Sequence, residues 1–155
     1  RKVADGLISG ARAALESAGA GHDLVEVPGA LEIPVAIRMA GEAGNWEGFV
    51  ALGCVIRGET THYETVCNDS SRGLMLLGVE RGLSIGNGIL TCENMAQAEA
   101  RADPLAMDKG GGAAAAALHL IALSRRFRGI PSRGGAVPDD TDILVAAGAS
   151  QPRTA

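Results

Sequence analysis

The segment Phe49–Gly73 combines a buried strand, a polar turn and a helix, and this combination restricts the fold more than any other feature. Residues 49–56 are apolar, β-branched or small without alternation, as in a strand covered on both faces. Residues 57–62 are polar with one glycine, and apolar or small residues then recur at helical spacing. Such a unit presents side chains and backbone N–H groups at the carboxyl edge of a parallel sheet. We therefore expect the functional site at that edge.

Strands and helices alternate along the rest of the chain. The apolar patterns predict helices over 2–19, 31–43, 62–81, 95–102 and 113–127, and strands over 23–27, 49–56, 83–92 and 142–149. This alternation favours an α/β fold of three layers, α/β/α, with a parallel sheet of about four strands. We expect one domain over residues 1–155, in which 128–140 is a glycine- and proline-rich connector and 142–149 is a tail strand.

The composition argues against two classes of partner. The net charge is −4, with 46% apolar and 21% charged residues, so no basic surface for nucleic acid or an anionic membrane is expected. No apolar run approaches the roughly 20 residues of a membrane-spanning helix. The start of the chain is amphipathic and lacks the continuous apolar core of a secretion signal. We expect a cytoplasmic protein.

The three cysteines, Cys54, Cys67 and Cys92, show no CxxC spacing. We interpret them as small core residues in a reducing compartment. No metal site is expected, because Cys67 follows His62 by five residues and so points away from it on a helix.

His62 is the residue best suited to proton transfer, since an imidazole titrates near neutral pH. The preceding turn, Arg57–Thr61, offers backbone amides and hydroxyls beside it. A hydrogen-bonded loop histidine without a catalytic role is the alternative at this point.

Arg101 and Lys109 are cations near helix ends, beside the glycine-rich segment Asp108–Gly112. Together they could hold a small phosphate, whereas each alone could be an ordinary surface charge. The segment is not a nucleotide phosphate loop, because the GxxxxGK[ST] spacing is absent. Glu32, at a helix start, can cap that helix or hydrogen-bond a polyhydroxyl ligand.

Two glycines flank Asn87 inside the strand predicted over 83–92. Glycine weakens a strand and is typical of places where another group approaches the backbone closely. We therefore expect a close neighbour at Gly86 and Gly88.

Four motifs together resemble the 6,7-dimethyl-8-ribityllumazine synthase family of riboflavin biosynthesis. They are VPGALEIP at 27–34, GCVIRGETTHYETVCNDSSRG at 53–73, GNGILTCEN at 86–94, and the spacing from Arg101 to Asp108-Lys109-Gly110. The resemblance runs from about Leu7 to Phe127, in the family's order. It implies a flavodoxin-like fold.

The resemblance also implies a reaction and a site. The family condenses 5-amino-6-(D-ribitylamino)uracil with 3,4-dihydroxy-2-butanone 4-phosphate, releases phosphate and water, and uses no cofactor or metal. His62 matches the family's proton-transfer histidine and Arg101 the arginine that holds the substrate phosphate. The other matching positions are Glu59, Thr60 and Lys109 for phosphate, and Ala30, Leu31, Glu32, Cys54, Val55, Ile56 and Asn87 for the ribityl chain and pyrimidine.

The family assembles as pentamers with active sites between adjacent subunits, and some members form decamers or icosahedral shells. The resemblance therefore implies a homo-oligomer built from pentamers that acts on small-molecule substrates.

This chain departs from the family pattern at its start, where the family's central first strand is absent ahead of residue 2. A sheet without that strand would leave backbone groups unpaired. We expect the tail strand 142–149 to fill the place, in a circularly permuted arrangement. A tail that pairs with a neighbouring subunit is the alternative.

The aromatic residue that stacks on the pyrimidine ring in the family is also missing from both termini. Reduced pyrimidine affinity is expected from this loss. An engineered or diverged shell protein with weak or no activity is therefore a second hypothesis, and a flavodoxin-like binding module is a third.

Overall fold

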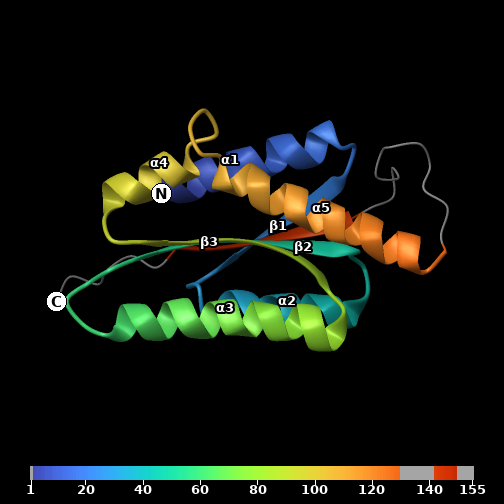
Figure 1. Cartoon of the computed structure of the whole chain (residues 1–155), viewed down its shortest axis with the longest axis horizontal. Helices are drawn as coiled ribbons and strands as arrows, with labels where there is room; N and C mark the ends of the chain where they lie inside the picture. Colours follow the sequence, from blue (N-terminus) through green and yellow to red (C-terminus); the bar gives the residue numbers. More distant parts are fainter. Residues whose placement is uncertain (1, 130–141, 150–155) are drawn as a thin grey trace.

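The computed structural model describes residues 2–129 and the backbone of residues 142–149. In chain order the elements are α1 (Lys2–Ser17), β1 (Gly21–Val27), α2 (Glu32–Ala43), β2 (Gly48–Ile56), α3 (His62–Arg81), β3 (Ser84–Cys92), α4 (Met95–Ala102), α5 (Lys109–Phe127) and β4 (Asp142–Ala149). The sheet lies between two layers of helices, with α1, α4 and α5 on one face and α2 and α3 on the other (Figure 1). The predicted three-layer α/β class is confirmed.

All pairings in the described sheet are parallel, and the strand order is β1-β4-β2-β3. Every residue of β2 except Ile56 is buried. This agrees with the unbroken apolar pattern, because a central parallel strand is covered by helices on both faces.

Successive side chains of β2 enter two separate cores. Phe49 and Ala51 pack with Ile33 and Ile37 of α2 and with Leu74 of α3. The intervening residues face the other layer, where they join α1, α4 and α5; they are Val50, Leu52 and Cys54. The alternation follows from the period of two in a strand.

The largest difference from the predicted boundaries is at α5, which begins at Lys109 and not at Ala113. Asp108 precedes the helix with φ of 42°, and its Oδ1 accepts a hydrogen bond of 3.0 Å from the Gly111 N–H. A Cβ on Gly110 would lie 2.1 Å from the carbonyl oxygen of Leu7. Gly110 therefore allows α5 to cross α1 at close range, so packing alone accounts for a glycine there.

The expected close neighbour at the β3 glycines is α5. A Cβ on Gly86 would lie 1.8 Å from the carbonyl oxygen of Ala113, and one on Gly88 would lie 3.0 Å from the Ala113 Cβ. The prediction from the Gly86-Asn87-Gly88 pattern is confirmed: helix backbone approaches Gly86, and the side chains of Leu52 and Ala113 approach Gly88.

The tail strand β4 lies inside the sheet, paired with β1 on one side and β2 on the other. Its Val145 is in register with both Leu24 and Val50. The strand therefore lies in the interior of the sheet. The sequence analysis predicted this position. The connector from 130 to 140 lies outside the described residues, and permutation relative to the family stays a prediction.

Among the described residues, no helix combines the length and apolar character needed to cross a bilayer.

Candidate functional site

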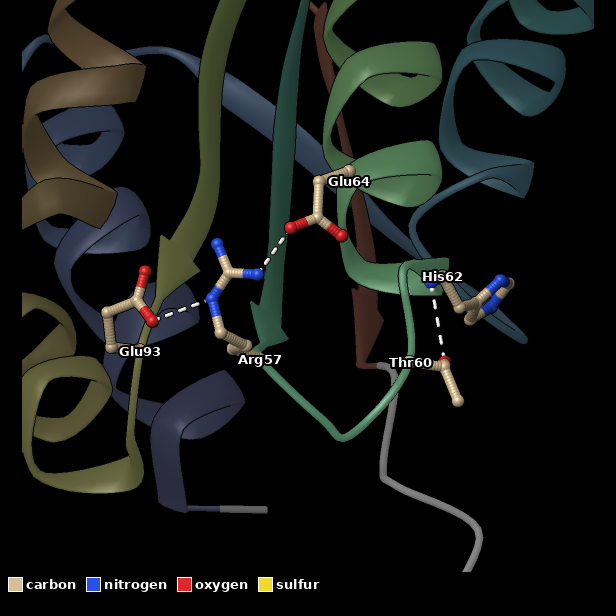
Figure 2. Close-up of polar contacts among 5 residues, drawn as sticks. All are labelled: Arg57, Thr60, His62, Glu64 and Glu93. Atoms are coloured by element: carbon tan, nitrogen blue, oxygen red, sulfur yellow. Dashed lines mark hydrogen bonds and ion pairs between the residues drawn. The ribbon is translucent and has the colours of Figure 1, made fainter.

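The turn between β2 and α3 carries the predicted proton-transfer residue. His62 is the first residue of α3, and its side chain is exposed at the carboxyl edge of the sheet. Its backbone N–H donates to the Thr60 Oγ1 over 3.4 Å (Figure 2). Glu59 and Thr60 are exposed as well. The predicted residues of this turn therefore lie on one accessible surface.

An apolar cluster packs beside this turn, and we call it the carboxyl-edge cluster. It joins the starts of α2 and α3 to the ends of β2 and β3 through Ala30, Leu31, Val55, Tyr63, Val66, Cys67 and Ile89. The adjacent Glu32 is exposed, and its carboxylate folds back, since a Cβ on Gly29 would lie 2.9 Å from the Glu32 Oε2. The structure thus brings Ala30, Leu31 and Val55 together beside the His62 turn.

Three residues of the predicted pyrimidine pocket are not part of this cluster. Cys54 and Ile56 pack on the opposite face of the sheet, with α1, α4 and α5. Asn87 is exposed in the middle of β3, in register with Ala51, and its Oδ1 accepts a hydrogen bond of 3.0 Å from the Ile89 N–H. Consecutive residues of a strand point to opposite faces, so Val55 cannot share a side-chain surface with Cys54 and Ile56.

The thiols of the sheet are poor nucleophiles. Burial raises the pKa of Cys54 to about 12, and the Cys92 thiol beside it adds to the rise. Burial also raises the pKa of the Cys92 thiol, although the charge of Arg101 opposes that rise. No disulfide forms, and the described residues contain no group of three or more His, Cys, Asp or Glu that could hold a metal ion.

The predicted phosphate-binding cations lie across the sheet from His62. Arg101 is in the last turn of α4, where its Nη1 donates to the Gln97 carbonyl oxygen over 3.2 Å. Lys109 is the exposed first residue of α5. Both helices belong to the layer opposite α3 (Figure 1). A single chain therefore does not bring the predicted imidazole and the two predicted phosphate-binding cations into one layer.

Sequence reasoning missed a charged network at the same edge, which is centred on Arg57. The Arg57 Nε donates to the Glu93 Oε2 over 2.7 Å, and its Nη1 forms an ion pair with Glu64 (Figure 2). The guanidinium carbon also lies 4.3 Å from the centroid of the Tyr63 ring, within cation–π range. The hydrogen bond from Arg57 lowers the pKa of Glu64.

A signal for half of this network was present in the strand pattern. Ile56 of β2 is in register with Cys92 of β3, so the next residues, Arg57 and Glu93, leave the sheet side by side. The Arg57 N–H also donates to the Cys92 carbonyl oxygen over 2.9 Å. Predicting the register of the two strands would have placed these opposite charges together.

Comparison with known proteins assigns the chain. The family model described as 6,7-dimethyl-8-ribityllumazine synthase matches residues 1–125. The chain belongs to the 6,7-dimethyl-8-ribityllumazine synthase family. Among its relatives, the lumazine synthase of Jannaschia sp. (strain CCS1) is 49% identical over 149 residues, which cover 96% of this chain and 83% of the relative.

Two further lumazine synthases are more similar over a shorter match. The protein of Sphingopyxis alaskensis is 55% identical over 123 residues, which cover 79% of this chain and 86% of the relative. The protein of Azorhizobium caulinodans is 57% identical over 129 residues, which cover 80% of each chain. The motif-based resemblance to lumazine synthases is confirmed.

The Jannaschia match also bears on the tail of this lumazine synthase homologue. Because the match covers 96% of the chain, most of the residues after Phe127 lie within it. A permuted chain would instead match its tail to a segment ahead of the counterpart of α1. The identity and coverage of this match leave the permutation as a prediction.

Proposed function

We propose that this chain condenses 5-amino-6-(D-ribitylamino)uracil with 3,4-dihydroxy-2-butanone 4-phosphate to form 6,7-dimethyl-8-ribityllumazine. The observation that carries the proposal is the exposed His62 turn on the carboxyl-edge cluster, in a chain of the lumazine synthase family. No observation favours the alternative of a shell protein without activity.

His62 is the proton-transfer group in this proposal. An amine must attack a ketone, phosphate must leave, and a ring must close with loss of water, so protons move at several steps. A positioned imidazole contributes typically ~10²–10⁴-fold to such a reaction. The exposure of His62 leaves its side chain accessible to a substrate at the sheet edge.

Arg101 holds the substrate phosphate and stabilises its departure, with Lys109 as a second cation. Thr60 meets the same phosphate through its hydroxyl. Glu59 contributes its backbone N–H, because a carboxylate facing phosphate would repel it. Glu59 and Thr60 are both exposed, so a ligand can reach these two residues.

The second substrate lies against the start of α2 and the end of β2. Glu32, whose carboxylate is exposed, accepts hydrogen bonds from ribityl hydroxyls beside Ala30 and Leu31. Val55 contributes a side chain to the pyrimidine pocket. Cys54 and Ile56 contribute backbone groups, since their side chains face the other layer. Asn87 contributes its exposed amide from β3.

The complete site forms between two copies of the chain, with His62 from one subunit and Arg101 from its neighbour. The separation of these residues into opposite helix layers supports this arrangement. Exposed apolar side chains on α2 and α3 support self-association as well; they are Val35, Met39, Met75, Leu76 and Val79. A homopentamer is the closed ring that we propose, with larger shells as assemblies of pentamers.

The proposal includes no cofactor or metal, as the family resemblance implies. We place the reaction in the cytoplasm, and the three cysteine thiols of the described chain support a reducing compartment.

The test is turnover by the purified protein with both substrates, followed by lumazine fluorescence and by release of inorganic phosphate. The wild-type chain is expected to give both signals in equal amounts. His62→Ala is expected to lower kcat by about 10²-fold, and Arg101→Met to raise KM for the phosphate substrate. The matched controls His22→Ala and Arg38→Met are expected to retain wild-type kinetics. Absence of lumazine from the wild-type reaction would overturn the proposal.

A further inference from the structure

Arg57 connects the two chain segments that carry the proposed catalytic groups. One carboxylate partner, Glu64, lies in the first turn of α3, two residues after His62. The other, Glu93, immediately precedes Asn94, the N-cap of α4, and α4 carries Arg101. Arg57, directly after β2, therefore forms side-chain contacts with both segments.

The contacts on the α3 side hold the turn that presents His62. The guanidinium stacks on Tyr63, the residue after His62, and pairs with Glu64 in the same helical turn. Tyr63 in turn packs on the carboxyl-edge cluster. The imidazole of His62 points away from the guanidinium (Figure 2), so Arg57 acts on its backbone and not on its ring.

The contacts on the α4 side hold the start of that helix. The Glu93 carboxylate receives the Arg57 Nε, while the Glu93 N–H donates to the Gln97 Oε1 over 3.0 Å. Gln97 is also the residue whose carbonyl oxygen receives the Arg101 Nη1 and whose N–H is capped by the Asn94 side chain. A chain of hydrogen bonds thus runs from Arg57 through Glu93 and Gln97 to Arg101.

Stability does not explain this arrangement well. The side chains of Arg57, Glu64 and Glu93 are 40%, 46% and 56% exposed, and exposed ion pairs contribute little to the free energy of folding. The planar guanidinium fork instead fixes direction, because it holds two carboxylates at set angles while it stacks on a ring.

We propose that Arg57 is a positioning residue that orients the His62-bearing turn through Glu64 and Tyr63, and the Arg101-bearing helix through Glu93. The inference rests on the proposed function, which assigns proton transfer to His62 and phosphate binding to Arg101. Because His62 and Arg101 of one chain serve neighbouring sites in the proposed ring, Arg57 sets one half of each of two sites.

The test separates the two halves with Glu64→Gln, Glu93→Gln and Arg57→Met. Glu64→Gln is expected to lower kcat by about 10-fold and to leave the affinity for inorganic phosphate within twofold. Glu93→Gln is expected to weaken phosphate binding by about 10-fold and to leave His62 ordered. Arg57→Met is expected to produce both effects. Arg57→Lys is expected to produce smaller effects of both kinds, because an ammonium lacks the planar fork of a guanidinium. The control Arg38→Met is expected to produce neither effect.

Two readouts decide the inference without turnover: phosphate affinity by calorimetry, and NMR relaxation of the His62 ring carbon in histidine-labelled protein. Lost positioning is expected to disorder the His62 ring in both Arg57→Met and Glu64→Gln, whereas Arg38→Met is expected to leave it ordered. The inference is overturned if Arg57→Met leaves both readouts within twofold of wild type. It is equally overturned if each glutamine variant changes both readouts in proportion to a lower melting temperature. An inactive wild type would count against the proposed function alone.

Discussion

Gly86 of β3 lies directly against the backbone of Ala113 of α5, so that a Cβ on Gly86 would come within 1.8 Å of the Ala113 carbonyl oxygen. Backbone on both sides of this contact leaves no flexible side chain that could move aside. α5 can therefore lie this close to the edge strand β3 only because Gly86 has no side chain.

Gly86→Ala is accordingly expected to destabilise the fold by about 1–3 kcal/mol or more, because α5 must shift away from β3. Gly112→Ala on the same helix is the matched control, since a Cβ there meets nothing within 4 Å. That control is expected to stabilise the helix by roughly 0.5–1 kcal/mol. Urea unfolding at one fixed protein concentration measures both changes. Equal midpoints for Gly86→Ala and wild type would contradict the close contact.

The proposed shared site predicts that two variants with impaired turnover complement each other. When His62→Ala and Arg101→Ala subunits assemble together at random, about a quarter of the interfaces combine an intact His62 with an intact Arg101. Lumazine formation by the coexpressed pair is therefore expected to reach about a quarter of the wild-type rate per site. A mixture no more active than its separate components would place both side chains in sites built by one chain.

The Arg57–Glu64 pair predicts a dependence of stability on pH. The hydrogen bond from Arg57 lowers the pKa of Glu64 below its ordinary value of 4.5. The pair therefore stabilises the folded chain fully above about pH 4.5, and this contribution is lost as the pH falls through the lower folded-state pKa. Glu64→Gln is expected to melt below wild type at pH 7, and the difference between the two is expected to close toward pH 3. A difference that stays constant over this range would show that the pair does not titrate as described.

The interior position of β4 predicts that the sheet depends on the tail. A chain that ends at Gly129 lacks the strand between β1 and β2, and both would expose an unpaired row of N–H and C=O groups. We expect that chain to melt at a lower temperature and to be cleaved faster by protease in β1. A chain that ends at Ala149 is the control and should behave as the full chain. If both truncated chains match the full chain, β4 is not needed inside the sheet.

Periodicity in the sequence was enough to predict the layers and the start of the site. The unbroken apolar run of β2 predicted burial on both faces, and the change to helical spacing placed the start of α3 at His62. The tail pattern likewise predicted a strand at 142–149. These features are local, so neighbouring residues carry the information.

Features that depend on contacts between distant segments were harder to predict. The motif match assigned Cys54, Val55 and Ile56 to one pocket but did not say which part of each residue faces it. Alternation along the strand sends the Val55 side chain to one core and the other two side chains to the opposite core. The Arg57–Glu93 contact spans 36 positions and arises from the register of β2 with β3. The early start of α5 escaped prediction because glycine is unfavourable in helices, while packing against α1 requires it at Gly110.

The Asp108 carboxylate that caps α5 has a consequence for phosphate binding at the proposed site. The positive end of the α5 dipole already has a built-in negative charge, so an anion beside Lys109 gains little from the helix itself. In the proposed site, phosphate binding then depends on the side chains of the half-buried Arg101 and the exposed Lys109. Because dissolved salt screens exposed charges, the affinity of the proposed site for a phosphorylated substrate is expected to fall as ionic strength rises.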